Sequence, residues 1–301
     1  MKAAHVALAV LVALIWGFAF VAIKIGLESF SPPQLTAMRF LIACLPVFFL
    51  PRPAISWVAL IGIGLFLFTG QFLLLFFGFV YGMPPGLASI VMQVQAFFTI
   101  MIAMAVLRDI PTGRQGIGIV VAFLGLVSIG FTVGGDLTYL GLGLTLGGAL
   151  SWAVGNVMVK RFGRADIDML SLMAWLSLVP PLPALAISAL IDEQPSLATS
   201  LAGASWPAIA AALYLGLIST TFAYAVWGHL LRQYSTALVA PFALLAPCTG
   251  VVSSMIVFGE QFDTLRLIGM ALILVGLAIT VVQPERLASW RGAGRRGRRD
   301  P

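Results

Sequence analysis

The sequence has very few charged side chains: Asp, Glu, Lys and Arg make up 9% of its 301 residues, whereas hydrophobic residues make up 60%. A soluble domain carries roughly 25% charged residues, so this chain lacks the polar side chains needed to cover a surface exposed to water. The composition therefore excludes a soluble globular protein and predicts an integral membrane protein. We attribute the net charge of +6 to membrane topology and expect no nucleic-acid partner.

Cysteine and histidine are equally scarce, at two residues each. Cys44 and Cys248 fall inside hydrophobic segments, where they are typical of small packing residues rather than of a disulfide framework. His5 and His229 cannot form a zinc site alone, and the sequence contains neither an H-E-x-x-H pattern nor a P-loop. We therefore expect no metal, no cofactor, no enzymatic activity and no transport driven by ATP.

What the chain does contain is hydrophobic segments that follow one another almost end to end. A membrane core about 30 Å thick requires about 20 apolar residues per helix, and runs this continuous are typical of helices rather than of barrel strands. Proline separates the segments at Ser31-Pro32-Pro33 and at Pro51-Arg52-Pro53. Ten spans are predicted, the first of them uncleaved: residues 4–27, 34–50, 55–81, 84–107, 115–133, 139–160, 168–191, 206–229, 237–258 and 265–283.

The distribution of positive charge predicts the orientation. With the N-terminus in the cytoplasm, fourteen of the seventeen Lys and Arg residues fall on the inner side, and only Lys24, Arg39 and Arg266 fall toward the outside. This asymmetry follows the positive-inside rule. We expect a multi-pass protein of the bacterial inner membrane with both termini in the cytoplasm, ending in a basic, disordered tail over residues 284–301.

The two halves of the chain resemble each other. Trp16 is followed eight residues later by Lys24, as Trp152 is by Lys160. Near the ends of the halves, Asp109, Gly118, Gly125 and Leu126 recur as Glu260, Gly269, Gly276 and Leu277, at a constant offset of 151 residues. Five spans per half is an odd number, so the second half enters the membrane in the opposite orientation. We predict an all-α fold of ten transmembrane helices in two inverted five-helix repeats, residues 1–135 and 136–283.

These residues resemble the EamA family of the drug/metabolite transporter superfamily. The pattern W-G-x-x-F-x-x-x-K occurs at 16–24, and 237–247, Gly259-Glu260 and Gly276 match the second half of the family pattern. Within the family, segments 82–89, 93–99, 151–156 and 226–231 are similar to the O-acetylserine/cysteine exporters. The resemblance implies alternating-access export of small amino acids or related metabolites by a monomer or a homodimer. Arg108-Asp109 departs from the usual Gly-Glu, and His229 replaces a small or hydroxyl residue.

Neutral amides are the main polar groups predicted inside the spans, where an unpaired polar group costs several kcal/mol. Gln71, Gln93, Gln95 and Asn156 offer donors and acceptors that suit the ammonium and carboxylate groups of a zwitterion. Gln93 and Phe97 are four residues apart and share a helix face, whereas Gln95 points away from it. We expect Gln93 and Phe97 to face a substrate cavity. Hydrogen bonding between helices is the alternative for Gln71 and Gln95.

Aromatic side chains form a second group of candidates. Trp16, Trp152, Tyr224 and Trp227 could line the substrate pathway, and the interfacial aromatic belt is the alternative. The phenylalanine run between Phe66 and Phe79 is expected to face lipid.

Lys24 and Arg39 are predicted near the outer ends of their spans, with Glu28 one turn beyond Lys24. Each is a candidate gate or an anchor for a substrate carboxylate, and snorkelling or a local ion pair is the alternative. His229, near the inner end of its span, could titrate or simply cap the helix. No acidic residue falls at the predicted midplane, so we expect facilitated export, or coupling through Lys24 or His229.

Two further functions stay open at this stage. A lipid or lipid-carrier translocase is one, although such relatives are usually four-helix chains that pair. A membrane sensor or partner that transports nothing is the other, and only the basic tail offers it an interaction surface. The expected partners are a small-molecule substrate and the lipid bilayer.

Overall fold

The computed structural model describes residues 1–163, 167–192 and 196–282, so the predicted basic tail lies outside the described residues. Within these ranges the chain is helical, with a single isolated β-bridge between Gly134 and Leu137. The α-helices are α1 (Ala3–Gly26), α2 (Pro32–Ala43), α3 (Trp57–Gly64), α4 (Gln71–Val80), α5 (Pro85–Val91), α6 (Gln95–Leu107), α7 (Gly113–Gly130), α8 (Tyr139–Phe162), α9 (Met169–Leu176), α10 (Pro181–Ile191), α11 (Leu197–Gly203), α12 (Trp206–Leu213), α13 (Ala223–Gln233), α14 (Thr236–Val239), α15 (Leu245–Phe258) and α16 (Thr264–Val281).

Nine helices in the described part of the chain are long and apolar enough to cross a membrane. The predicted second span is the exception, because α2 has only 12 residues and gives way after Cys44 to a 3-10 turn, η1 (Leu45–Phe48). Pro46 explains the break, since proline has no N–H for the helix ladder and its ring clashes with the carbonyl four residues earlier. The chain is thus an all-helical integral membrane protein.

Serine and threonine begin two of the helices where the sequence carries a capping signature. Ser31 accepts a hydrogen bond from the backbone N–H of Gln34, whose side chain accepts one from Ser31 N–H. Thr112 and Gln115 form the same reciprocal pair at the start of α7. Each box satisfies two backbone donors that the first turn leaves free, which fixes where α2 and α7 start.

Four of the long spans contain a π-helical or 3-10 segment. π-Helical segments join α3 to α4 (η2, Leu65–Gly70) and α12 to α13 (η4, Tyr214–Phe222). 3-10 segments join α5 to α6 (η3, Met92–Val94) and precede α15 (η5, Ala240–Leu244). Such segments change the angular position of the side chains that follow, and π-helical turns are frequent at functional sites.

Local geometry recurs at the 151-residue offset seen in the sequence. The residue after α6, Arg108, has a φ of 56°, and the residue after α15, Gly259, has a φ of 68°. The helices that follow, α7 and α16, both have 18 residues and begin after the capping residues Thr112 and Asp263. A left-handed residue favours glycine, so Arg108 occupies a position where glycine is the unstrained choice.

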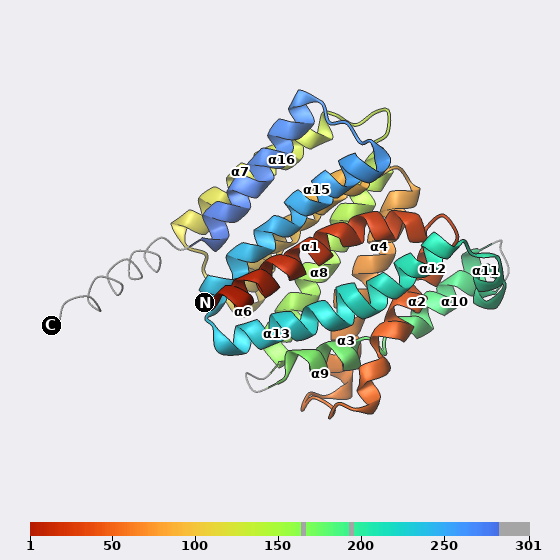
Figure 1. Ribbon diagram of the computed structural model, residues 1–301. Helices are drawn as coiled ribbons and strands as arrows, with labels where there is room; N and C mark the ends of the chain where they lie inside the picture. Colours follow the sequence, from red (N-terminus) through yellow and green to blue (C-terminus); the bar gives the residue numbers. More distant parts are fainter. Residues whose placement is uncertain (164–166, 193–195, 283–301) are drawn as a thin grey trace.

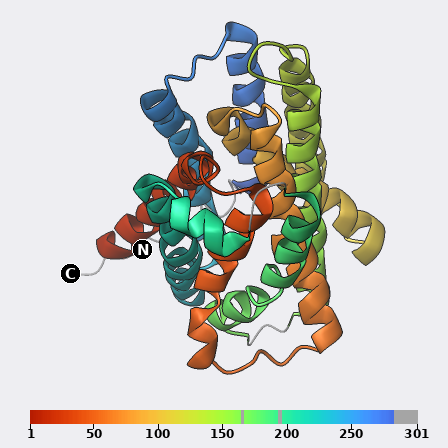
Figure 2. The same cartoon turned by 90° about the vertical axis from the view of Figure 1, so that its right-hand side faces the viewer.

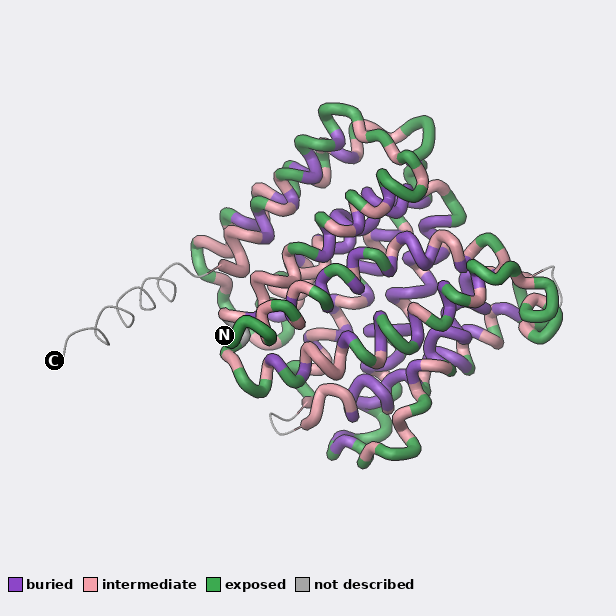
Figure 3. The backbone as a smooth tube through the Cα atoms, viewed as in Figure 1, coloured by how far each residue is buried: buried purple, intermediate pink, exposed green. Residues whose placement is uncertain are grey.

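The helices pack as one bundle with a separate pair along one margin. α1 lies beside α12, α13 and α15, while α8 lies beside α4 and α6 (Figures 1 and 2). α7 and α16 form the marginal pair in Figure 1. Buried positions concentrate on the central helices, and α7 and α16 are mostly exposed or half-buried (Figure 3).

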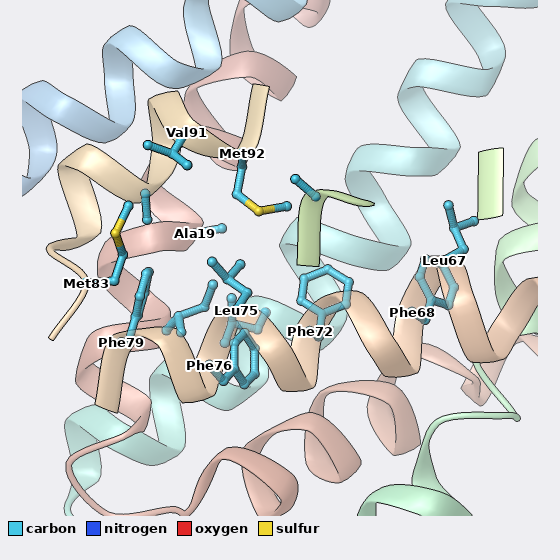
Figure 4. Packing of buried hydrophobic residues seen from close by; sticks show 14 of the residues in the cluster. Ala19, Leu67, Phe68, Phe72, Leu75, Phe76, Phe79, Met83, Val91 and Met92 are labelled. Carbon is cyan, nitrogen blue, oxygen red and sulfur yellow. The ribbon is translucent and has the colours of Figure 1, made fainter. Parts of the chain in front are cut away.

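The expectation that the phenylalanine run faces lipid is wrong for most of its members. Phe68, Phe72, Phe76 and Phe79 are all buried, whereas Phe66 is exposed. They lie along the α3–α4 span and pack in one cluster with Ala19 of α1 and Met92 of η3 (Figure 4). A hydropathy pattern cannot separate these two environments, because lipid tails and a protein core are equally apolar.

Candidate substrate-binding site

The most deeply buried cation in the described part of the chain is Arg39, whose residue is 4% exposed. It is the eighth residue of α2, two turns below the N-terminus of that helix and therefore about 10 Å deeper. The sequence placed Arg39 at the outer end of its span, where a long side chain can snorkel to water. The observed burial rules out snorkelling in this conformation.

The guanidinium of Arg39 is only partly satisfied by its neighbours. Its Nε donates to Thr220 Oγ1 at 3.1 Å, and the group lies 4.0 Å from the centre of the Phe72 ring. Its Nη1 is buried without a hydrogen-bond partner, and no carboxylate of a described residue lies within ion-pair distance. Buried charges are normally paired, so this arrangement leaves capacity for an anion.

Arg266 shows what a satisfied buried arginine looks like in the same molecule. Its side chain is 7% exposed, and its Nη1 lies 2.8 Å from a carboxylate oxygen of Asp136. It also donates to the hydroxyl and carbonyl of Thr132 and to the carbonyl of Gly134. Arg266 ties the α7–α8 turn to α16, so we assign it a structural role, in contrast to Arg39.

The π-helical segment η4 presents the polar groups that face Arg39. Thr220 and Thr221 donate their hydroxyls to carbonyls five residues back, at Leu215 and Gly216, as the wider turn allows. Ser219, one residue before Thr220, has a hydroxyl that is buried without a partner. α2 and η4, which the Arg39–Thr220 hydrogen bond joins, therefore each carry one buried polar group without a partner. Sequence reasoning missed Ser219 and Thr220, and their only signal was a Ser-Thr-Thr run inside an apolar span.

Three of the four predicted aromatic residues come together beside this segment. The Trp16 ring lies 5.5 Å from the Tyr224 ring and 5.1 Å from the Trp227 ring, and its Nε1 donates to the carbonyl of Ser219 at 3.1 Å. All three side chains are half-buried. Trp152, the predicted fourth member, lies on α8 and makes no ring contact with these three residues.

The four predicted amides do not converge on one point. Gln95 Oε1 accepts from Asn156 Nδ2 at 3.5 Å, which joins α6 to α8. Gln93 donates to the carbonyl of Ser89 on its own span and is half-buried. Gln71 is 5% exposed at the start of α4, and Phe97 is 3% exposed. Gln93 lies in the 3-10 segment η3, which turns more per residue than an α-helix and so changes the angle between Gln93 and Phe97.

Lys24 and Glu260 both lie at the end of the bundle where α1 finishes. No ion pair joins Lys24 to Glu28, both of which the structure describes, so the local pair considered above is absent. Glu260, in the turn after α15, accepts a hydrogen bond from Gly86 N–H at 3.1 Å. Burial raises the pKa of the Glu260 carboxyl, although the Gly86 hydrogen bond and the Lys24 charge oppose the rise.

His229 lies at the opposite end of the bundle and is exposed to the surroundings. Its Nε2 is 3.0 Å from the side-chain nitrogen of Gln233, and its ring meets the His5 ring edge to face at 5.9 Å. Lys160, at the inner end predicted for α8, pairs with Asp109 at 2.5 Å, and both side chains are more than half exposed. Neither His229 nor Lys160 takes part in the buried polar group around Arg39.

Long apolar helices that enclose a few polar groups define a multi-pass helical membrane protein. Comparison with known proteins identifies the family to which it belongs. The chain belongs to the EamA-like transporter family, which matches residues 4–131 and again residues 139–282. This result confirms the resemblance drawn from the W-G-x-x-F-x-x-x-K pattern and its companions.

Similar proteins extend over nearly the whole chain. A protein of Salmonella typhimurium described as a probable amino-acid metabolite efflux pump is 39% identical over 91% of this chain and 93% of its own length. A probable amino-acid metabolite efflux pump of Escherichia coli K12 is 38% identical over the same shares. A probable terminal-alkyne amino-acid exporter of Streptantibioticus cattleyicolor is 26% identical over 96% of this chain and 97% of its own.

The fold is also that of a solved crystal structure. It superposes with a TM-score of 0.62, covering 95% of this chain and 99% of that one, at 19% identity. At this level of identity the likeness concerns the fold alone.

Proposed function

We propose that this protein exports small amino acids or closely related metabolites, of the cysteine or O-acetylserine type, across the bacterial inner membrane by alternating access. The observation that carries the proposal is the 38–39% identity, over 91% of the chain, to proteins described as probable amino-acid metabolite efflux pumps. Half-buried polar and aromatic side chains inside the bundle, among them Trp16, Gln93 and Tyr224, are consistent with a polar substrate.

We further propose that the chain has ten spans in two inverted repeats, residues 1–135 and 136–283, with both termini in the cytoplasm. Two family matches, each covering about half of the chain, support this division, as do the left-handed caps at 108 and 259. The tenth span is α2 with η1, residues 32–48, which at 1.5 Å per residue reaches roughly 25 Å. Inverted repeats with a midplane site are common in transporters.

Export is tested by overproducing the protein in a bacterium and quantifying amino acids in the medium by mass spectrometry. Cysteine or O-acetylserine should accumulate with the wild type and less with Gln93→Ala, at equal amounts of protein in the membrane. A rise in a different amino acid keeps export and changes the substrate. No change in any amino acid would favour the lipid-carrier or sensor functions.

The sensor alternative makes a separate prediction. Deleting residues 284–301 should leave most of the export activity if the protein is a transporter, because the tail adds charge but no span. Reporter fusions at the C-terminus and within residues 196–205 test the topology: the C-terminal fusion should report the cytoplasm, and the other fusion should report the outside. The reverse result would refute the orientation, and the same side for both fusions would refute the number of spans between them.

A further inference from the structure

We propose that Arg39 binds the carboxylate of the transported amino acid, an inference that rests on the proposed function. Arg39 is 4% exposed, its Nη1 has no hydrogen-bond partner, and no described carboxylate pairs with it. A cation inside a membrane protein is costly unless it is paired or serves a ligand. Arg266, the other deeply buried arginine among the described residues, has its carboxylate partner within the chain. Arg39 thus lacks an anion that an amino-acid substrate would supply.

The surroundings of Arg39 leave one part of the guanidinium available. The Phe72 ring covers a face of the group at 4.0 Å, and Thr220 Oγ1 occupies the Nε donor. The unpaired Nη1 therefore offers the remaining edge, and a guanidinium edge matches the geometry of a carboxylate. Ser219, adjacent to Thr220 on the same turn, carries a second buried hydroxyl without a partner.

The neighbouring aromatic cluster provides for the ammonium group of the same substrate. Trp16 is tied to this turn by its hydrogen bond to the Ser219 carbonyl, and its ring lies 5.5 Å from that of Tyr224. Aromatic faces attract ammonium groups through the ring quadrupole. A zwitterion therefore finds an anion site on Arg39 and a cation site on Trp16 and Tyr224. No acidic side chain is required, which agrees with the position of the described acids at helix ends and in turns.

The test uses purified full-length protein in liposomes and counterflow of radiolabelled L-cysteine under reducing conditions. Cysteamine lacks the carboxylate and 3-mercaptopropionate lacks the ammonium, so the two compounds separate the two contacts. For the wild type, we expect cysteamine to compete about 10- to 100-fold less well than unlabelled L-cysteine, the range typical for loss of a hydrogen bond to a charged group. Arg39→Gln should raise the KM for L-cysteine by a similar factor and abolish the preference over cysteamine.

Two further variants control for charge and for folding. Arg39→Lys keeps the charge but loses the planar fork, so its KM should fall between those of the wild type and Arg39→Gln. Arg52→Gln removes an exposed arginine that stacks on Trp57 at 4.1 Å, and it should leave the preference unchanged. Each variant is compared only when it elutes as a single species in size-exclusion chromatography.

The outcomes separate the inference from the proposed function. Counterflow of L-cysteine with equal competition by cysteamine in the wild type would overturn the role of Arg39 and leave amino-acid export intact. This comparison needs no variant, so it can overturn the role of Arg39 even if every Arg39 substitution fails to fold. Absence of counterflow for L-cysteine, O-acetyl-L-serine and a panel of other amino acids by folded wild-type protein would overturn both.

Discussion

Glycines bring the backbones of α7 and α16 into contact, and replacing one of them tests the packing directly. A Cβ atom added at Gly125 would lie 2.6 Å from the carbonyl oxygen of Gly269, and one added at Gly269 would lie 2.7 Å from the carbonyl oxygen of Gly125. Ordinary van der Waals contact begins near 3.4 Å. Gly125→Ala therefore forces the two helices apart by about 0.8 Å.

The expected loss of stability follows from the dispersion attraction between α7 and α16 that this separation removes. Opening a gap of 0.5–1 Å forfeits about a quarter to a half of the dispersion attraction between the atoms concerned, and membrane helices depend on such packing. We expect Gly125→Ala to lower the free energy of unfolding by about 1–3 kcal/mol, even after the gain in helix propensity of alanine. Gly116 on the same helix has no heavy atom within 4 Å of an added Cβ, so Gly116→Ala is the matched control.

The assay heats purified protein in detergent and measures the fraction that stays monodisperse in size-exclusion chromatography. Gly125→Ala and Gly269→Ala should each lower the midpoint by several degrees, while Gly116→Ala should leave it unchanged or raise it. Equal midpoints for Gly125→Ala and Gly116→Ala would refute the close contact between α7 and α16.

Three further predictions use the same thermal assay. Arg108→Gly should raise the free energy of unfolding by about 1 kcal/mol, and Gly259→Ala should lower it by about as much, because both residues have a left-handed backbone conformation. An unchanged free energy of unfolding for Arg108→Gly would contradict this. Glu260→Gln should flatten the pH dependence of the free energy of unfolding. Because the pKa of Glu260 is raised in the folded state, its contribution to stability is fully present below its usual pKa and is lost as pH rises through the folded pKa. Parallel pH profiles for the wild type and the variant would argue against that shift. Arg266→Met should cost about 3 kcal/mol, and Asp136→Asn about 1 kcal/mol, since the guanidinium keeps its carbonyl acceptors when Asp136 is replaced; an equal loss would mean that the ion pair alone matters.

Much of the fold could be predicted because membrane helices follow local rules. Proline and capping residues fixed the start of α2 and α7, and continuous apolar runs predicted helices for every long span that the structure contains. The sequence shows Pro46 inside the predicted second span. It does not show that the α-helix ends before this proline and continues only as the 3-10 turn η1.

The candidate site was less predictable, because the helices that form it are distant in the chain. Arg39 meets Thr220 across 181 residues, and Trp16 meets Ser219 across 203. The aromatic residues Trp16, Tyr224 and Trp227 were identified individually, yet nothing in their spacing indicated that Trp152 would lie elsewhere. The π-helical segment η4 decides which of its hydroxyl groups turn inward, and such a segment has no reliable sequence signal.

The sequence by itself determined that this chain is an all-helical membrane protein of the EamA-like transporter family, since composition, span length and family motifs are properties of the chain alone. Only the tertiary structure decided that Phe72 is buried rather than lipid-facing, and that Arg39 is a buried cation rather than a residue at the membrane surface. The physical reason is that lipid and protein interior are equally apolar. Hydropathy therefore locates a helix in the membrane, but only packing against other helices determines which of its faces turns inward.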